Sequence, residues 1–303
     1  MTSAFRAFLT ALLSLALIGC TALVSDRTDV PVSPAAPGAL RMATWNVHYI
    51  RLRAEEGDWS VGDWARRRGP AAAALRDIGA DIVAFQEMES FGGGASGDVN
   101  LARDDLLGAL PGYAVAASGP PASFPNTQPI FYRADRLDML DQGWFFFSET
   151  PDVIYSRTYD GSWPAFASWA RLRDRRGGPA FTVINVHFEY RSGSNRTRSA
   201  RLVAERMAPR MAAGEPVILL GDLNAMEWMR TAGILREAGF DFAGVRGATY
   251  HLNRGLNLFG AIDHIAATDG VSLAGGPEVL RRRYDGVWPS DHYPVFADLV
   301  LPR

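Results

Sequence analysis

The chain has 303 residues, of which 48% are hydrophobic and 21% charged, so it is long enough to bury a large core in one domain or two. Its formal net charge of −2 argues against an obligate nucleic-acid binder. Arginine-rich segments occur at 66–68, 196–201 and 281–283, and such segments are most often solvated faces.

The beginning of the chain resembles a secretory signal. An apolar run from Ala7 to Ile18 follows Arg6 and is too short to span a bilayer comfortably. It ends in Leu17-Ile18-Gly19-Cys20, which resembles a bacterial lipobox, where the cysteine is lipidated and becomes the mature N-terminus. An ordinary signal peptide cut nearby, or a buried helix, is the alternative. Because Cys20 is the only cysteine, structural disulfides are excluded.

We therefore expect residues 1–19 to be a lipoprotein signal peptide and Cys20 to carry the lipid. The protein is then exported and held at the periplasmic face of a bacterial membrane, or otherwise secreted. Residues 20–39, rich in Pro, Ala, Ser and Thr, are predicted to be a flexible tether. No Pro-rich linker divides residues 40–303, which predicts a single domain there.

Strand-like and helix-like runs alternate through this domain. Strands are expected near 40–43, 81–85, 113–117, 130–133, 137–147, 181–184, 217–220 and 293–300, and helices at 64–78, 199–213 and 226–238. The Gly-rich stretch 90–100 is expected to be a mobile loop. Many hydrophobic strands with few crossover helices predict mixed sheets rather than one parallel sheet.

Six short polar motifs lie beside these apolar runs. They are Thr44-Trp45-Asn46, Gln86-Glu87, Asn185-Val186-His187, Gly221-Asp222-Leu223-Asn224, Ile262-Asp263-His264-Ile265 and Ser290-Asp291-His292. Asp, Glu, Asn and His side chains at strand ends can converge at one edge of a sheet core. Such a group combines hard oxygen ligands with acid–base residues and suits the hydrolysis of a phosphate ester.

In this order the six motifs resemble the endonuclease/exonuclease/phosphatase superfamily, over residues 40–300. The resemblance implies an α/β fold, a four-layer α/β/β/α sandwich with two packed mixed β-sheets and the site at one edge of them. It also implies hydrolysis of a P–O bond by in-line attack of water, with Mg²⁺ (or Mn²⁺) as cofactor.

The resemblance assigns Glu87 as the main metal ligand and Asn46 as a supporting one. A carboxylate at the end of a buried strand is unfavourable unless it is paired or metal-bound, and a salt-bridged strand end is the alternative for Glu87. For Asn46 the alternative is a turn-forming amide. Asp291 is expected either to contact the metal or to orient its neighbours.

The catalytic group implied by the resemblance is His187, Asp222, Asn224, Asp263 and His292. Asp222 would orient or deprotonate the attacking water and Asn224 would donate to a phosphoryl oxygen, although both could simply cap the following helix. The two histidines would share proton transfer and charge stabilisation, and Asp263 would hold the tautomer of His292.

Other residues are assigned more loosely. Asn185, Arg191 and Arg198 are predicted to bind substrate, the two arginines because they follow His187 closely. His264 is expected to face the opposite side of its strand. His48 is either structural or a substrate contact, and His251 has no motif support. An aromatic cluster, Trp163, Phe166 and Trp169, is expected in the core, or else as a base-stacking or lipid-facing rim.

The sequence thus predicts a membrane-tethered, metal-dependent phosphoesterase that works as a monomer. Its substrate is a phosphate ester, with a nuclease or phosphodiesterase as the first reading, so that nucleic acid is the partner. A sphingomyelinase-like phospholipase or an inositol-phosphate phosphatase is the alternative, and a phospholipid is then a candidate partner. A third possible function is that of a non-catalytic binding lipoprotein with the same fold.

Overall fold

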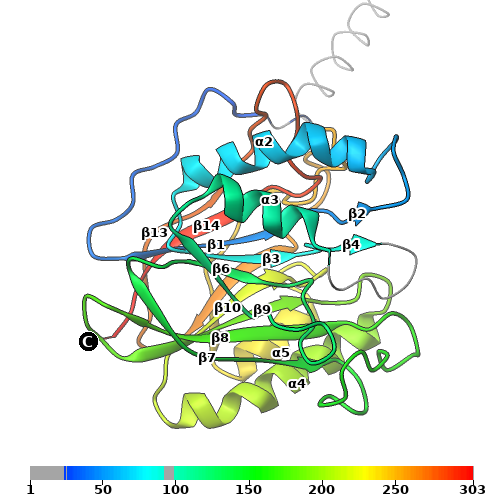
Figure 1. Ribbon diagram of the computed structural model, residues 1–303. Coiled ribbons are helices and arrows are strands. Elements are labelled where there is room, and N and C mark those ends of the chain that lie inside the picture. The colour runs from blue at the N-terminus through cyan, green and yellow to red at the C-terminus, as the bar shows by residue number, and fades with distance from the viewer. Residues whose placement is uncertain (1–23, 25, 92–98, 303) are drawn as a thin grey trace, which may run out of the picture.

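The computed structural model describes residues 24, 26–91 and 99–302. Two six-stranded β-sheets pack face to face, and helices cover the outer face of each sheet (Figure 1). Each sheet is mixed, since parallel and antiparallel neighbours occur in both. The predicted four-layer α/β/β/α sandwich is therefore confirmed.

The two sheets are built in similar ways. The first has the order β13 (Ser272–Val279), β14 (Val295–Val300), β1 (Leu40–Asn46), β3 (Ile82–Gln86), β6 (Ile130–Arg133) and β5 (Tyr113–Ala116). The second has the order β11 (Phe240–Phe242), β12 (Asp263–Thr268), β10 (Val217–Asp222), β9 (Ala180–His187), β8 (Phe166–Asp174) and β7 (Leu137–Phe146). A small parallel pair joins β2 (Ile50–Arg51) to β4 (Ser90–Phe91). Each large sheet has one parallel pair at its centre, β1 with β3 and β9 with β10.

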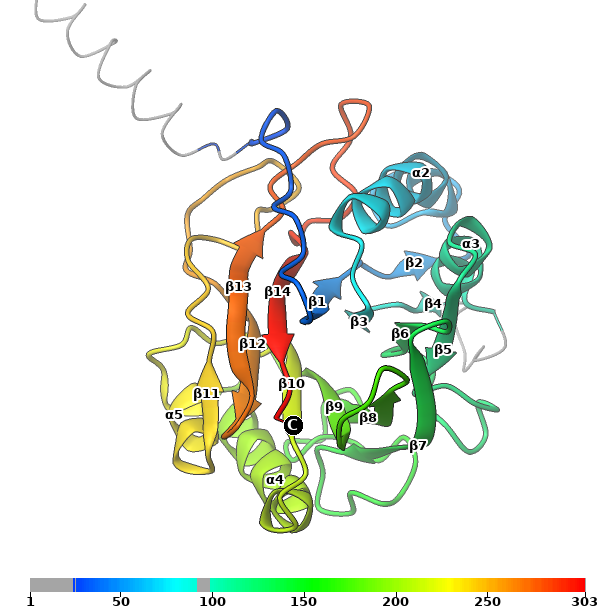
Figure 2. The ribbon, with the colours of Figure 1, turned by 90° about the vertical axis from the view of Figure 1, so that its left-hand side faces the viewer.

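Helices α2 (Val61–Ile78) and α3 (Leu101–Ala109) lie over the first sheet, and α4 (Gly193–Ala212) and α5 (Arg230–Glu237) lie over the second (Figure 2). Helix α2 begins before the predicted Trp64 because the Ser60 hydroxyl accepts the Asp63 N–H at 3.0 Å. It ends as predicted at Gly79, which adopts the left-handed conformation with φ 59°.

Helices α4 and α5 differ from their predicted bounds. Helix α4 begins six residues before Ser199, because Ser192 caps its first turn by accepting the Asn195 N–H at 3.1 Å. Helix α5 begins at Arg230 rather than Met226, because the residues before it form a turn after strand β10. Strand β8 takes up two of the clustered aromatics, Phe166 and Trp169, while the Trp163 side chain is 80% exposed.

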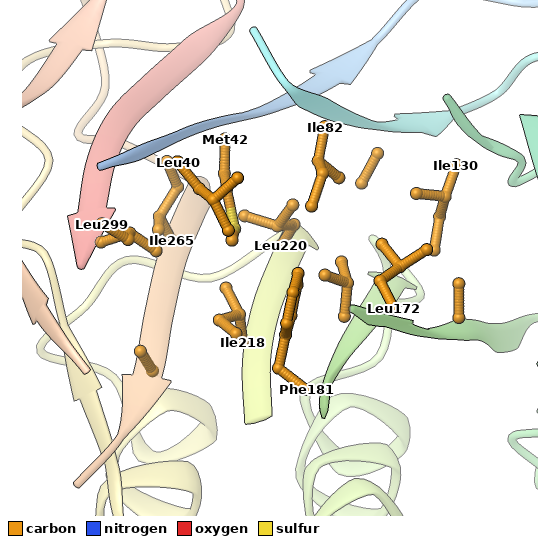
Figure 3. Close-up of a cluster of buried hydrophobic side chains, with 14 of the residues drawn as sticks. Leu40, Met42, Ile82, Ile130, Leu172, Phe181, Ile218, Leu220, Ile265 and Leu299 are labelled. Atoms are coloured by element: carbon orange, nitrogen blue, oxygen red, sulfur yellow. The ribbon is translucent and has the colours of Figure 1, made fainter. Parts of the chain in front are cut away.

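The core between the sheets follows from the two-residue alternation of strands. Leu40 and Met42 of β1 point toward the second sheet, whereas Ala43 and Trp45 point outward beneath α2. Side chains from both sheets fill the space between them, as Figure 3 shows for Ile82 and Leu220. Toward the ends of β1, β3, β9 and β10, the same inward-facing positions become polar.

The described part of the N-terminal segment, which the sequence predicts to be a flexible tether, makes hydrogen bonds to the domain. The N–H of Arg27 donates to the carbonyl of Arg281 at 2.6 Å, and the N–H of Ala36 donates to the Asp298 carboxylate at 2.8 Å. The predicted signal peptide, Cys20 and most of the Gly-rich loop fall outside the described residues. Within the described ranges, none of the helices combines the length and the apolar character needed to cross a membrane.

Candidate active site

Strand topology brings the polar motifs to one edge of the sandwich. Because β9 and β10 are parallel, His187 and Asp222 are paired at their carboxyl ends. Strand β12 runs antiparallel, so its first residue, Asp263, is the partner of Asp222 on the other side. In the facing sheet the parallel strands β1 and β3 end together at Asn46 and Gln86, and Glu87 follows directly.

Asp222 lies at the centre of this group and is only 1% exposed. Its Oδ2 atom is 3.3 Å from Asn46 Nδ2, 3.7 Å from His187 Nε2 and 3.9 Å from His292 Nε2. Its Oδ1 atom accepts the backbone N–H of Asn224 at 2.8 Å. Burial, with the nearby Asp263 charge, raises the pKa of Asp222 to about 6.

Asp263 and His292 form a buried pair, as the sequence predicts. Asp263 Oδ2 lies 2.9 Å from His292 Nδ1, which fixes the orientation of the imidazole and leaves Nε2 directed toward Asp222. Burial opposes charge on His292, but the Asp263 carboxylate outweighs it and raises the pKa of His292 to about 10. His292 is therefore an imidazolium at neutral pH, held between two carboxylates.

Glu87 and His187 form the more open side of the site. Their side chains are 25% and 27% exposed, and His187 Nε2 lies 3.8 Å from Glu87 Oε1. Three residues of the site have a positive φ, namely Glu87 at 52°, Asn224 at 45° and His48 at 65°. Non-glycine residues rarely adopt this conformation, and such strain tends to cluster where a site is pre-organised.

Glu87 offers carboxylate oxygens to a divalent cation on this side. Asn46 Nδ2 donates to Glu87 at 3.1 Å and to Asp222, so one amide holds the two carboxylates near each other. Asn46 Oδ1 instead accepts the His48 N–H at 3.1 Å. Ligation through that oxygen would therefore require the amide to rotate and to release this hydrogen bond.

A second group could also hold a metal. Single ligand atoms of Asp222, Asp263 and His292 lie within 4.8 Å of one another, and the buried Asp263 Oδ1 atom has no hydrogen-bond partner. The Asp263 carboxylate raises the pKa of that His292 imidazole. A metal at this position would have to displace the imidazole proton.

Asp291 is paired with His48. Its Oδ1 atom contacts His48 Nδ1 at 2.7 Å, and although burial acts in the opposite direction, this hydrogen bond holds the pKa of Asp291 below its usual range. This contact is consistent with the second of the two predicted roles, and metal binding by Asp291 stays a prediction. Ser290 completes the loop, since its hydroxyl donates to the Asn46 carbonyl at 2.7 Å.

Asn185 is not placed where a substrate could reach it, so its predicted role as a substrate-binding residue is corrected. The side chain is fully buried between the sheets, and its amide donates to the carbonyls of Phe85 and Gln128. Its Oδ1 atom accepts from Gln86 Nε2 at 2.7 Å. Because β3 and β9 belong to different sheets, this bond ties the two halves of the site together.

The two predicted arginines lie on the outside. Arg198 pairs with Glu149 at 2.5 Å and lies over the ring of Tyr159, so its charge already has a partner. Arg191 is exposed, and its guanidinium lies 5.1 Å from the ring of Tyr190.

The remaining histidines are structural in different ways. His264 faces the helix side as expected, with Nε2 2.9 Å from the Ala225 carbonyl. His251 is buried and stacks on Tyr293 with ring centroids 3.9 Å apart.

Comparisons with known proteins agree with this architecture. Over residues 43–292 the sequence matches the Endonuclease/Exonuclease/phosphatase family. A solved protein of that family from Bacteroides thetaiotaomicron is similar, with 25% identity and a TM-score of 0.69, covering 88% of this chain and 98% of its own. A mannosyl-6-phosphatase from the same organism has 26% identity and a TM-score of 0.69, covering 87% of this chain and 100% of its own.

More distant structures share the fold. The catalytic domain of human Nocturnin, with 15% identity and a TM-score of 0.60, covers 88% of this chain and 96% of its own. No match is found among curated proteins. The family match spans most of the sequence and includes all six motifs. The chain therefore belongs to the endonuclease/exonuclease/phosphatase family.

Proposed function

We propose that this protein is a divalent-metal-dependent hydrolase of phosphate esters. The observation that carries the proposal is the position of the Asp222 carboxylate, which lies within 4 Å of both His187 and His292 while Asp263 holds the second imidazole. This arrangement places a carboxylate that can accept a proton beside an imidazole whose pKa is raised.

The proposed reaction uses each side chain according to its surroundings. Asp222 orients the attacking water and accepts its proton as oxygen bonds to phosphorus. His292, charged at neutral pH, donates from Nε2 to a phosphoryl oxygen. Asn224 Nδ2 donates one hydrogen bond to the Phe188 carbonyl at 2.8 Å, which orients the amide. The second N–H of the amide donates to a phosphoryl oxygen. His187, on the open side and 3.7 Å from Asp222, passes the proton that Asp222 accepted from water to the leaving alcohol oxygen.

A metal bound at Glu87 and Asn46 would supply Lewis-acid polarisation of the phosphoryl group and stabilise negative charge there. The hard oxygen ligands favour Mg²⁺ or Mn²⁺. The candidate substrates from the sequence are nucleic acid, phospholipid and inositol phosphate.

A phosphomonoester of a sugar is a further candidate. One observation favours it, namely the 26% identity with a mannosyl-6-phosphatase whose whole length is covered. A sugar phosphate also suits an acidic protein whose Arg198 is already paired, because nucleic-acid binding relies on several cations contacting phosphates.

The activity is tested with bis-p-nitrophenyl phosphate and a panel of DNA, RNA, sphingomyelin, inositol phosphates and sugar phosphates. EDTA should abolish hydrolysis and Mg²⁺ or Mn²⁺ should restore it. Asp222→Asn should abolish turnover, and Asp241→Asn, an exposed aspartate on β11, should match the wild type. Full turnover in a verified metal-free preparation, or none with any ester, would defeat the proposal.

Lipid anchoring remains a proposal from the sequence. Cys20 is proposed to carry the lipid and to hold the domain at the periplasmic face of a bacterial membrane. Cys20→Ser should move the protein from the membrane to the soluble fraction and change its processing. Unchanged fractionation would refute the anchor and leave the catalytic proposal untouched.

A further inference from the structure

A cavity adjoins the catalytic group and is not used by the reaction described above. It has a volume of about 110 Å³ and is lined, among others, by His48, Trp59, Arg67, Tyr250, Asn253 and Asp291. A single water needs only about 10–15 Å³ of such space, so the cavity exceeds what one water fills. We call it the side cavity.

The side cavity shares a wall with the active site. Asp291 precedes His292 in the chain, and the ring of Tyr250 lies 5.0 Å from the His292 ring. The N–H of His48 donates to Asn46 Oδ1, next to the proposed metal ligands. A group bound in the cavity would therefore be close enough to belong to a substrate whose phosphate lies at Asp222.

Two buried nitrogen atoms on the wall lack hydrogen-bond partners. Arg67 is 3% exposed and uses Nε on Asp63 and Nη1 on two carbonyls, but its Nη2 atom has no partner. His48 is 8% exposed, and its Nε2 atom is also without a partner while Nδ1 contacts Asp291. Buried polar atoms are normally satisfied, so these two nitrogens leave the wall with spare hydrogen-bonding capacity.

The charges of the wall disfavour an anion as the natural occupant. Three carboxylates, Asp58, Asp63 and Asp291, lie beside the two basic residues. Asp63 already pairs with two arginines and Asp291 with His48. Hydroxyl groups can donate to carboxylates and accept from arginine or histidine, so they fit this mixture of donors and acceptors better than a second phosphate does.

An aromatic surface completes the wall. The Trp59 and His48 rings are nearly parallel, 7° apart, with centroids 4.9 Å from each other, and Tyr49 lies within 6 Å of both. Trp59 adopts a left-handed backbone conformation with φ 63°, which is unfavourable for a bulky residue. The surrounding structure therefore holds the indole ring at the cavity despite this strain.

We propose that the side cavity binds the sugar ring of a sugar-phosphate substrate, with its hydroxyls on the polar wall and its apolar face on Trp59. This inference rests on the proposed phosphoesterase function, since it places the phosphate of the same molecule at Asp222. Trp59 is then a specificity residue, and the alcohol that the enzyme releases is a polyhydroxylated ring.

The test compares the metal-loaded enzyme on hexose phosphates, n-butyl phosphate and nucleoside monophosphates. Wild type should show kcat/KM at least about 10-fold higher for its best hexose phosphate than for n-butyl phosphate, and Trp59→Ala should remove that difference while n-butyl phosphate turnover changes less than about 2-fold. Trp163→Ala, which alters a Trp that is 80% exposed and outside the cavity, is the matched control and should behave as wild type.

Several outcomes would overturn the inference. The first is an equal kcat/KM of the wild type for hexose and n-butyl phosphates. The second is an equal fall of both kcat/KM values in Trp59→Ala. The third is a preference of the wild type for nucleotides that Trp59→Ala removes. If no ester is hydrolysed, the proposed function fails, and the side cavity is judged by titration with methyl hexosides. Quenching of Trp fluorescence that Trp59→Ala loses would support the cavity, and no response would refute it.

Discussion

At the scale of single residues, the site depends on carboxylates that control their neighbours rather than on isolated acids and bases. Asp222 contacts two histidines, and Asp263 charges one of them. An isolated buried carboxylate or imidazolium would be strongly unfavourable, so each of these groups is stabilised by the others. Removing one member should therefore impair the whole group.

The Asp263–His292 pair gives the first prediction. His292→Ala should lower kcat by about 100-fold or more, the usual scale of general acid–base catalysis, because the imidazolium beside Asp222 is lost. Asp263→Asn should resemble it, since it removes the group that orients and charges the imidazole. The double variant should be little worse than the poorer single one.

These kcat values are measured at saturating metal, with circular dichroism to verify folding and Asp241→Asn as the exposed control. His251→Ala is unsuitable as a control, although its lack of a motif predicts a silent change, because His251 is buried against Tyr293. Near-normal turnover in folded His292→Ala would remove the pair from the mechanism.

Glu87 gives the second prediction. Glu87→Gln keeps the shape of the side chain but removes the charge that the proposed cation needs, so the Mg²⁺ concentration for half-maximal activity should rise by about 10-fold or more. Glu56→Gln, on an exposed position, should leave the requirement unchanged. The measurement is a metal titration of an EDTA-treated enzyme, and identical titration curves would exclude Glu87 as a ligand.

At the scale of strands and helices, the close approach of β9 and β10 positions Asp222. A Cβ atom on Gly221 would lie 2.1 Å from the Val186 carbonyl oxygen, so only glycine fits beside that backbone. Gly221→Ala should destabilise the fold by about 2 kcal/mol or more and also reduce turnover, because the strain falls on the peptide next to Asp222.

Gly233→Ala is the matched control for that change. Gly233 lies in helix α5, where a Cβ atom would meet nothing closer than the Arg230 guanidinium at 3.8 Å. It should stabilise the protein by about 0.5–1 kcal/mol, the difference between alanine and glycine in a helix. Urea unfolding of both variants tests the pair, and a Gly221→Ala protein as stable as wild type would contradict the close approach.

The family resemblance of the six motifs predicted the layers, and apolar runs predicted most of the strands around the site. A short apolar run such as 217–220, followed directly by a polar motif, is a local signal. Strand β13 was not predicted, because its exposed, Gly-rich sequence lacks such a pattern. The shifted start of α5 has a similar cause, since the residues after Asp222 are apolar yet form a turn.

The sequence motifs predicted which residues belong to the site, but not the contacts that packing of the two sheets creates. The pairing of Asp263 with His292 could be expected from the motifs, whereas the burial of Asn185 depends on contacts with the facing sheet that no local pattern encodes. The same applies to the side cavity. Trp59 and Tyr250 are 191 positions apart and come together only through packing.

At the scale of the whole molecule, both sheets must be packed for the site to exist. Asn46 and Glu87 come from the first sheet, and His187, Asp222 and Asp263 come from the second. Arg41 and Asp298, on adjacent strands of the first sheet, form a buried pair at 2.7 Å that helps to hold its centre. Conditions that weaken global stability should therefore also impair the catalytic group.

His251 gives the last prediction, which concerns acid stability. Burial lowers the pKa of His251 to about 4, whereas an unfolded histidine has a pKa of about 6.5. The folded protein thus takes up this proton less readily than the unfolded chain does. Its contribution to stability is fully present above about pH 6.5, falls as the pH decreases, and levels off below about pH 4, a total of about 3 kcal/mol.

Replacing that histidine isolates its contribution. His251→Gln keeps an acceptor for the Gly255 N–H, which His251 Nδ1 accepts at 3.2 Å, but it cannot take up a proton. The variant should be less stable than wild type at pH 7.5, because the stacking on Tyr293 is lost. The gap in Tm should narrow by about 4 °C by pH 5, since only the wild type is penalised by protonation. Parallel Tm profiles of the two metal-free proteins would show that His251 is not the group that makes the fold sensitive to acid.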